Sequence, residues 1–217
     1  MAKEQTENYL KNIYKLQSHG GKVTTSSLSQ QLKITPASVS EMVRRLAEEG
    51  YVTHAPYKGV QLTVEGRKKA LRIIRRHRLW ELFLVRILKY HWDEIDEEAE
   101  RLEHITSDRL ERRIDELLGF PDRDPHGDVI PTVEGKVVEG GRAPLSDVGE
   151  GKTVVVSRVS DSSPEILQYA SKLGIALGKK IRVKDKVDFD GSLRVDVGGK
   201  ERFISSKLAQ NVFVEVD

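Results

Sequence analysis

The sequence favours an α+β fold in three parts: an N-terminal winged helix-turn-helix, an all-α middle part and a C-terminal small β-barrel. Three patterns support this architecture: two short helices precede a predicted hairpin, a long apolar helix opens the middle part, and short alternating strands fill the last third. A chain of 217 residues is long enough for one to three small domains. We place their boundaries at residues 1–72, 73–140 and 145–217.

The first part begins with helices in helix-turn-helix spacing. Residues 5–18 carry an apolar stripe at helical intervals, and two glycines follow them. Thr24 or Thr25 caps a second helix, and Thr35 followed by Pro36 is a favourable start for a third. About three residues join the last two helices, which is typical of a helix-turn-helix.

Two strands follow these helices. Residues 51–55 and 60–64 alternate between apolar and polar side chains, and a turn containing proline and glycine separates them. Two helices followed by a hairpin predict a winged helix.

The middle part is predicted to be helical. Residues 63–90 read as one long helix that is basic in its first half and apolar nearly all round in its second. Such a helix is buried on several sides, which in a small chain favours a subunit interface. Two shorter helices are predicted at 93–105 and 107–118, and the Gly- and Pro-rich residues 121–150 read as a linker.

The last part has the pattern of a small β-barrel. A short helix at 163–173 lies between the first two of five predicted strands. These strands cover residues 153–159, 179–187, 193–199, 200–206 and 211–216.

The net charge of +2 conceals an uneven distribution. Residues 1–90 contain 17 Lys and Arg against 7 Asp and Glu, whereas residues 91–128 contain 5 against 14. A basic first part predicts a polyanionic partner such as double-stranded DNA. The acidic segment indicates either cation binding or a charged, solvated helix.

Several classes of protein are disfavoured. The absence of cysteine excludes disulfides, thiolate zinc sites and a cysteine nucleophile. No apolar run is long enough for a membrane helix and no export signal is visible, so we expect a cytoplasmic protein without a membrane partner. No glycine-rich phosphate loop or G-x-S-x-G motif occurs, and we therefore expect neither an enzyme nor a small-molecule substrate.

One cluster of residues has metal-binding character. Glu100 precedes Glu103 by three residues and His104 by four, so all three lie on one face of a helix. His77 and Glu81 have the same i, i+4 spacing on the long helix. Imidazole and carboxylate groups are ligands of hard divalent ions. The alternative is a solvated acidic helix with a surface histidine.

Six blocks of the sequence stand out in order along the chain: ENYLKNIYKL (7–16), ITPASVSEMVRRLAEEGYV (34–52), GVQLTVEGRKKA (59–70), RHRLWELFL (76–84), EEAERLEHITSDRLERRI (97–114) and PHGDVIP (125–131). Together they resemble, in the order of the family, the diphtheria-toxin-repressor family of metal-dependent transcriptional regulators. The resemblance covers essentially the whole chain and implies a winged-helix domain, a dimerisation and metal-binding domain, and an SH3-like (FeoA-like) domain.

The resemblance implies two metal sites. Glutamate at position 100 resembles the manganese-type members, whereas the amide of Asn8 departs from the Met or Asp of the family. Asp161 resembles a ligand of the third domain, with Glu165 as its rival, and Asp96 stands where some members have histidine. The implied primary ligands are Asn8, His77, Glu100, Glu103 and His104. The implied ancillary ligands are Glu81, Asp124 and His126, with Asp161, Asp96 and Glu165 as further candidates.

The predicted recognition helix begins at Pro36, and its first residues would enter the major groove. Thr25, Ser26 and Thr35 serve either as phosphate donors or only as helix caps, and Arg44 either contacts phosphate or faces solvent. The expected DNA contacts are Thr25, Ser26, Thr35, Pro36, Ala37, Ser38, Ser40, Glu41, Arg44 and, at the tip of the wing, Lys58.

A donor set without sulfur suits Mn²⁺, with Fe²⁺ as the alternative, and the general affinity order predicts that Zn²⁺ and Co²⁺ also bind in vitro. The resemblance therefore predicts a Mn²⁺-activated homodimeric repressor that binds a near-palindromic operator and controls metal-uptake genes. Three alternatives remain open: an Fe²⁺-responsive repressor of the same family, a winged-helix regulator that metal does not switch, and a metal-buffering or enzymatic protein whose basic charge is incidental.

Overall fold

The computed structural model describes residues 2–18, 20, 22–55, 59–138 and 140–215. The chain forms two compact units, and we describe each by itself. The first unit contains residues 1–77, 100–111 and 131–137, and the second contains residues 78–99, 112–130 and 138–217. The division into domains at 1–72, 73–140 and 145–217 stays a prediction.

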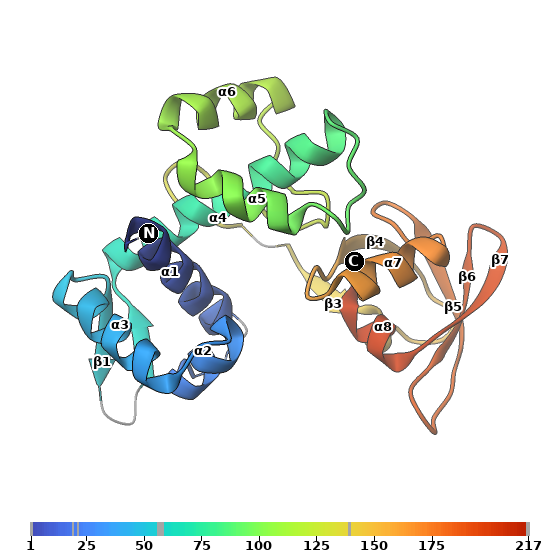
Figure 1. Cartoon of the computed structure of the whole chain (residues 1–217). Helices are drawn as coiled ribbons and strands as arrows, with labels where there is room; N and C mark the ends of the chain where they lie inside the picture. Colours follow the sequence, from blue (N-terminus) through green and yellow to red (C-terminus); the bar gives the residue numbers. More distant parts are fainter. Residues whose placement is uncertain (1, 19, 21, 56–58, 139, 216–217) are drawn as a thin grey trace. The chain divides into compact units, whose positions relative to one another are not determined.

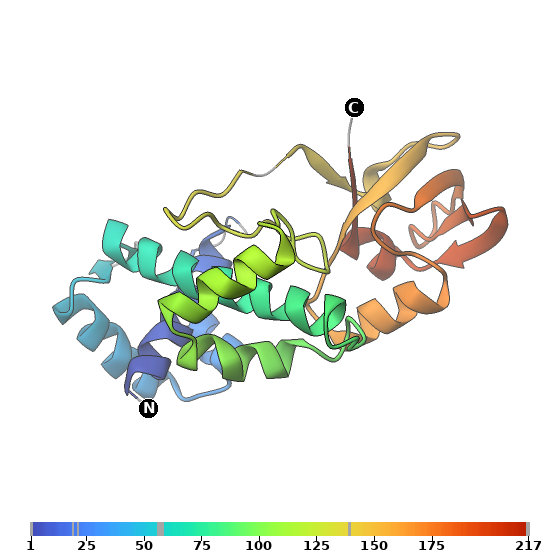
Figure 2. The ribbon, with the colours of Figure 1, turned by 90° about the horizontal axis from the view of Figure 1, so that it is seen from above.

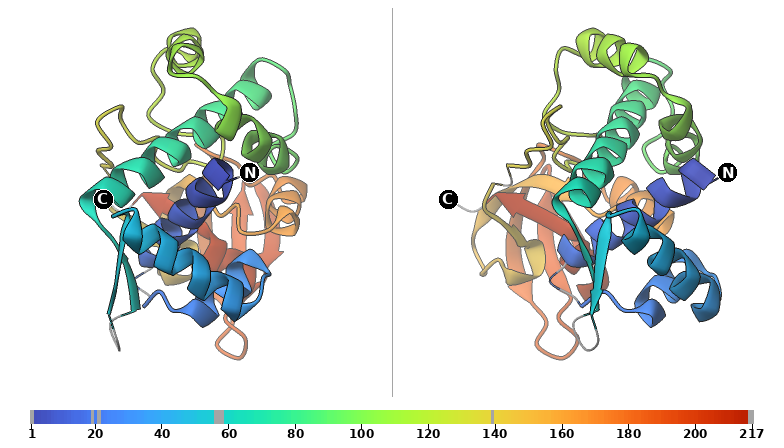
Figure 3. Two further views of the ribbon diagram at one scale, coloured as in Figure 1. Left: turned by 60° about the vertical axis from the view of Figure 1, so that its left-hand side comes forward. Right: turned by 90° about the vertical axis from the view of Figure 1, so that its left-hand side faces the viewer.

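The first unit opens with a winged helix-turn-helix, as predicted. Thr24 caps the second helix in a reciprocal pair with Ser27. Thr35 caps the third helix by accepting a hydrogen bond from the backbone N–H of Ser38, and Pro36 occupies its first turn. The elements are α1 (Ala2–Ser18), α2 (Thr25–Leu32), α3 (Pro36–Glu48), β1 (Val52–Ala55) and β2 (Gly59–Leu62), and the hairpin leads into α4 (Val64–Arg86), as Figures 1 and 3 show.

A single apolar cluster joins these elements. Leu10 and Ile13 of α1 and Leu46 of α3 are fully buried in it. The hairpin packs closely against the segment before α2 at Gly59, where an added Cβ would lie 2.4 Å from the backbone oxygen of Val23. Only glycine fits this close approach at a φ of +78°, which explains why β2 begins there.

Helix α5 (Asp96–Ile105) lies beside α4, and α6 (Asp108–Leu118) follows it (Figure 2). The predicted long helix is wrong at its end, because α4 stops at Arg86 rather than at residue 90. Lys89 has a left-handed φ of 63°, which ends the helical path. Leu84 is buried within the chain, whereas Leu88 is half exposed.

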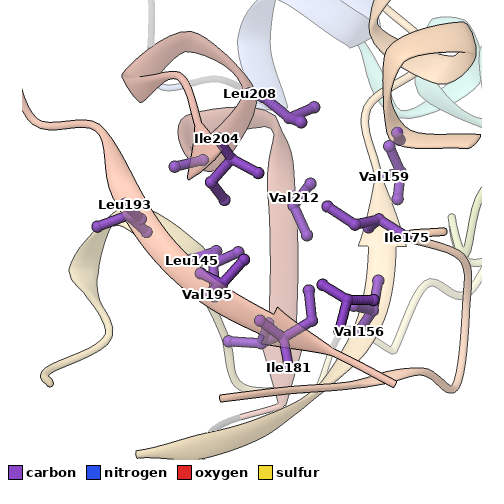
Figure 4. Close-up of a cluster of buried hydrophobic side chains, with 14 of the residues drawn as sticks. Leu145, Val156, Val159, Ile175, Ile181, Leu193, Val195, Ile204, Leu208 and Val212 are labelled. Atoms are coloured by element: carbon purple, nitrogen blue, oxygen red, sulfur yellow. The ribbon is translucent and has the colours of Figure 1, made fainter. Parts of the chain in front are cut away.

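The second unit contains an antiparallel sheet with strand order β3-β8-β4-β5-β6-β7. Its side chains enclose one apolar core, which includes Leu145, Ile181 and Val212 (Figure 4). The elements are β3 (Arg142–Pro144), the 3-10 turn η1 (Leu145–Asp147), β4 (Thr153–Val159), α7 (Pro164–Lys172), β5 (Lys180–Lys186), β6 (Leu193–Val197), β7 (Lys200–Ile204), α8 (Ser206–Asn211) and β8 (Val212–Glu215).

The predicted linker at 121–150 is folded. Ile130 is buried against the helices, and Leu145 is fully buried in the core of the sheet. The segment also contributes β3 and η1, which the sequence pattern missed. The short helix α8 was missed as well. Glycine and proline indicated turns correctly, but a turn-rich segment can still be buried. Among the described helices, none is long and apolar enough to cross a membrane.

Candidate metal centres

Three helices of the first unit bring ionisable side chains together in a cluster that we call the first centre. Helix α5 supplies two carboxylates and an imidazole on one face, as the spacing predicted. The first centre consists of Glu7, Asn8 and Lys11 from α1, His77 from α4, and Glu100, Glu103 and His104 from α5.

Glu103 is the hub of the first centre and is fully buried. Its Oε1 accepts a hydrogen bond of 2.6 Å from Nζ of Lys11, and its Oε2 lies 2.5 Å from Nδ1 of His77. Lys11 also donates to Oε2 of Glu100. Burial lowers the pKa of Lys11, but the two carboxylates outweigh burial and raise it, so the ammonium stays charged.

His104 lies on the other side of the same carboxylates. Its Nε2 is 3.4 Å from Oε1 of Glu103 and 3.9 Å from Oε1 of Glu100. Burial lowers the pKa of His104, but Glu100, Glu7 and Glu103 outweigh it and raise the pKa to about 9. Burial raises the pKa of Glu100, but His104 and Lys11 outweigh it and lower the pKa to about 2. The metal-free centre therefore holds His104 protonated and Glu100 ionised at neutral pH.

The donor atoms suit a hard divalent cation. Among the described residues, Oδ1 of Asn8 and Nε2 of His104 are buried and make no hydrogen bond. Nδ1 of His104 lies 2.8 Å from Oε2 of Glu7, so Glu7 can hold the tautomer in which Nε2 is free to bind metal. One atom from each of His77, Glu100 and Glu103 lies within 4.8 Å of the others. A partly buried set of oxygen and nitrogen donors fits Mn²⁺ or Fe²⁺.

Sequence reasoning missed two members of the first centre, Glu7 and Lys11. Both are buried, with exposed fractions of 3%. They are four residues apart on α1, and this spacing alone reads as a solvent-exposed ion pair on a helix surface. The sequence feature that could have indicated their burial is their position beside the apolar stripe of α1.

A second cluster, which we call the second centre, lies in the second unit. It consists of Glu81 from α4 and of Asp124 and His126 from the loop after α6, and one atom of each lies within 4.8 Å of the others. All three are buried. Nε2 of His126 donates to the backbone oxygen of Trp92 at 2.7 Å, which leaves Nδ1 facing Oε1 of Glu81 at 3.6 Å as the nitrogen that can bind metal once it carries no proton.

Protons balance charge in the second centre. Burial, with the negative charges of Glu81 and Asp128, raises the pKa of Asp124 to about 8, although Arg78 acts in the opposite direction. Burial lowers the pKa of His126, but Glu81 and Asp124 outweigh it and raise the pKa. A divalent cation at this site would therefore replace protons.

The remaining ancillary candidates are less enclosed. Asp161 has a side chain that is 30% exposed and lies 4.0 Å from Arg158, and its charge contributes to the raised pKa of His126. Asp96 is exposed at the start of α5, with one carboxylate oxygen within 4.8 Å of one of Glu81. Glu165 is exposed in the first turn of α7, and among the described residues it is not part of the group formed by Glu81, Asp124 and His126.

The predicted DNA contacts lie mostly on one exposed face. Thr25 is half-buried, and Ser26 and the predicted residues around the start of α3 are exposed. The hydroxyl of Thr35 caps α3 by accepting from the backbone N–H of Ser38, and it shares a hydrogen bond with the hydroxyl of Ser38. The hydroxyl of Ser40 donates to the backbone oxygen of Pro36. The exposed residues of this α3 face are Thr35, Pro36, Ala37, Ser38, Ser40, Glu41 and Arg44, while Lys58 lies outside the described residues.

Comparison with known proteins places these features in a family. A family model described as "Iron dependent repressor, N-terminal DNA binding domain" matches residues 1–60, and one described as "Iron dependent repressor, metal binding and dimerisation domain" matches residues 63–132. The diphtheria toxin repressor of Corynebacterium efficiens is 29% identical over 98% of this chain and 95% of its own length. A solved structure described as a manganese-dependent transcriptional repressor in complex with manganese is 42% identical, with a TM-score of 0.90 over 97% of this chain and 99% of that chain.

The chain belongs to the diphtheria-toxin-repressor family of metal-dependent transcriptional repressors. A FeoA domain model matches residues 143–216, which confirms the predicted SH3-like third part. The iron-dependent repressor IdeR of Mycobacterium leprae is 31% identical over 74% of this chain and 68% of its own length. The structure of the manganese regulator SloR is 32% identical, with a TM-score of 0.79 over 98% of both chains.

Membership settles the class of the protein. The family consists of DNA-binding repressors and not of enzymes, as the sequence predicted. The first two matched stretches contain the DNA-binding domain and the metal-binding and dimerisation domain, so DNA, a divalent metal and a second copy of the chain are its partners. Both iron- and manganese-dependent relatives occur, so family membership leaves the metal open.

Proposed function

We propose that this chain is a cytoplasmic, Mn²⁺-activated repressor that binds a near-palindromic operator as a homodimer and controls metal-uptake genes. The observation that carries the proposal is the first centre, where hard oxygen and imidazole donors from α1, α4 and α5 converge without sulfur. Its primary ligands would be Asn8, His77, Glu100, Glu103 and His104. Ancillary ligands would be Glu81, Asp124, His126 and Asp161, with Asp96 and Glu165 as weaker candidates.

The bound ion would supply two positive charges and a fixed coordination geometry. His104 loses its proton from Nε2 and keeps Nδ1–H on Glu7, which orients the ring. Glu100 and Glu103 offer carboxylate oxygens, and Asn8 offers its otherwise unused Oδ1. Since Asn8 lies on α1 and the carboxylates lie on α5, these residues then hold α1 in one position against the helices that carry them.

Helix α1 also contacts the recognition helix. The guanidinium of Arg45 in α3 donates to the hydroxyl of Thr6 at 3.2 Å, and Tyr9 and Met42 share one apolar cluster. A change that fixes α1 therefore acts on α3 directly. Metal binding and operator binding must then strengthen each other by the same factor.

The exposed face of α3 offers the expected contacts to DNA. Ser38 and Ser40 suit phosphate or base edges, Ala37 a thymine methyl, and Glu41 the amino group of cytosine. Arg44 pairs with Glu48 only weakly, at 3.9 Å, and both side chains are exposed. Arg44 can therefore turn to a phosphate at little cost.

Selection from a randomised pool of duplex DNA tests the proposal, with one arm in Mn²⁺ and one in EDTA. We expect a near-palindrome to be enriched only with Mn²⁺. Equal enrichment in both arms would show a regulator that metal does not switch. Enrichment in neither arm would contradict the proposed operator binding.

An iron-responsive repressor is the second candidate, because curated relatives such as IdeR are named as iron-dependent. Anaerobic selections over the same series of free Fe²⁺ and free Mn²⁺ concentrations separate the two candidates. Enrichment at lower Fe²⁺ than Mn²⁺ would favour the iron-responsive repressor, and the opposite result supports Mn²⁺.

A further inference from the structure

The side chain of Lys11 occupies an unusual place at the first centre. Its ammonium donates to Oε2 of Glu100 and, at 2.6 Å, to Oε1 of Glu103, and only 3% of the residue is exposed. His77 borders the same position, with Nδ1 2.5 Å from Oε2 of Glu103 and 4.0 Å from Oε2 of Glu100. Even without Lys11, His77 and the two glutamates have ligand atoms close enough together to hold a metal ion.

The two carboxylates have a second side, which His104 faces. Nε2 of His104 approaches Oε1 of Glu103 and Oε1 of Glu100, at 3.4 and 3.9 Å, without a hydrogen bond to any described residue. Glu100 thus turns one oxygen toward Lys11 and the other toward His104. The carboxylate pair therefore meets one basic group on each side, Lys11 on one and His104 on the other, as carboxylates in a two-metal site meet one cation on each side.

We propose that the ammonium of Lys11 fills one of two adjacent cation positions, so that the first centre takes a single divalent ion, on the side of His104. Lys11 is a resident cation that determines how many ions bind. The position that it fills is a latent metal site whose ligands are His77, Glu100 and Glu103. His77, counted above among the primary ligands, then belongs to this latent site and not to the single bound ion. This inference rests on the proposed metal binding at the first centre.

Charge supports a resident ammonium. Glu7, Glu100 and Glu103 place three carboxylates in one largely buried cluster, and Lys11 is the only lysine or arginine that the described contacts bring to Glu103. One divalent ion and one ammonium together carry three positive charges, which balance the three carboxylates. A buried charge is tolerated when it is paired in this way.

Replacing Lys11 by glutamate tests the inference, because the variant removes the ammonium and adds a ligand of the kind that Mn²⁺ prefers. Equilibrium dialysis with Mn²⁺ should find one more ion per chain in Lys11→Glu than in the wild type. Electron paramagnetic resonance should show an exchange-coupled pair of ions, which two-metal sites hold roughly 3.5–4 Å apart. The wild type should show isolated ions only.

Lys15→Glu is the matched control, since Lys15 lies one turn further along α1 and the change in charge is the same. We expect it to bind as many ions as the wild type, without coupling. Lys11→Met guards against misfolding of the first variant: it adds no charge, keeps the three remaining ligands, and should show the coupled pair at a higher Mn²⁺ concentration.

Two outcomes would overturn the inference: a coupled pair already present in the wild type, or no coupled pair in either Lys11 variant while the wild type binds Mn²⁺. Failure of the proposed function looks different. In that case the wild type itself binds no Mn²⁺ in dialysis, whatever the variants do.

Discussion

The first and second centres both bury carboxylates beside histidine, but they balance the negative charge differently. In the first centre, Lys11 and a protonated His104 provide positive charge, and the pKa of Glu100 falls to about 2. In the second centre, burial dominates, and the pKa of Asp124 rises to about 8. One cluster remains charged without metal, while the other holds a proton on a carboxyl group at neutral pH.

The difference follows from the elements that carry each centre. Helices α1, α4 and α5 can each present a long side chain, so a lysine can reach two carboxylates. The second centre depends on a tight loop in which Asp124 already accepts hydrogen bonds from the backbone N–H groups of His126 and Asp128, both at 2.9 Å. Metal must therefore displace mainly the His104 proton in one centre and carboxyl and imidazole protons in the other.

The largest expected effect is that of Glu103→Gln. The variant removes a charge that both Lys11 and His77 contact, so Mn²⁺ affinity of the first centre should fall at least about 100-fold, since even outer-shell changes cost 10–100-fold. Leaving Lys11 with a single carboxylate should also destabilise the metal-free protein by about 3 kcal/mol. Calorimetric titration and urea unfolding measure the two effects.

The control for this variant is Glu97→Gln, an exposed position on the same helix. Its affinity and stability should match the wild type. If Glu103→Gln still binds Mn²⁺ at the second centre, the two centres act independently. Loss of both would show that the two centres are not independent.

Gly127→Ala should act on the second centre alone. An added Cβ would lie 2.1 Å from the backbone oxygen of Ser157, and the residue has a φ of +93°. The loop must then move, at a cost of about 2 kcal/mol or more, and Asp124 and His126 would leave Glu81. Gly149→Ala, where an added Cβ meets nothing within 4 Å, should be close to neutral in the same unfolding and Mn²⁺ titration experiments.

The sequence predicted the first centre better than the second for a physical reason. Glu100, Glu103 and His104 share a face because helix geometry fixes it, whereas Asp124 and His126 meet Glu81 only through the fold of a loop that composition marked as a linker. Only resemblance to the family indicated the second set. Turn residues such as Gly127 look alike in a mobile linker and in a loop packed closely against a strand.

The missed residues teach a related lesson. The Glu7 and Lys11 pair has the spacing of a surface ion pair, and its burial depends on α5, which is distant in sequence. The winged helix was predictable because its caps at Thr24 and Thr35 are local signals. The early end of α4 was not, since Lys89 has no side-chain reason for its left-handed φ.

The two centres should also differ in their dependence on pH. The raised pKa of His104, about 9, means that its charge stabilises the metal-free fold below pH 6.5 and that this contribution is lost as the pH rises toward 9. Metal binding needs the neutral ring, so affinity of the first centre should rise about tenfold per pH unit between pH 7 and 9. At the second centre, metal must displace the proton of Asp124 and, below the ordinary histidine pKa of 6.5, that of His126 as well, so the dependence in that range should be steeper.

Calorimetry in buffers of different ionisation enthalpy counts the released protons. We expect Glu103→Gln, which isolates the second centre, to release more protons per ion at pH 6, below the ordinary histidine pKa, than His126→Gln, which isolates the first. Equal proton release in the two variants would remove the distinction between a centre balanced by cations and one balanced by protons.

The smallest expected effect concerns Asp161. If Asp161 is a ligand, the third part of the chain contributes to the second centre; if it is not, Glu81, Asp124 and His126 form that centre by themselves. The charge of Asp161 contributes to the raised pKa of His126, yet its side chain is 30% exposed and also faces Arg158. A partly solvated ligand contributes little, so Asp161→Asn in the Glu103→Gln background should weaken Mn²⁺ binding about threefold. Glu165→Gln, at an exposed position on α7, should leave the titration unchanged. The reverse order would assign the ligand to Glu165 instead, and a loss of 100-fold at Asp161 would mean that the loop centre is incomplete without that residue.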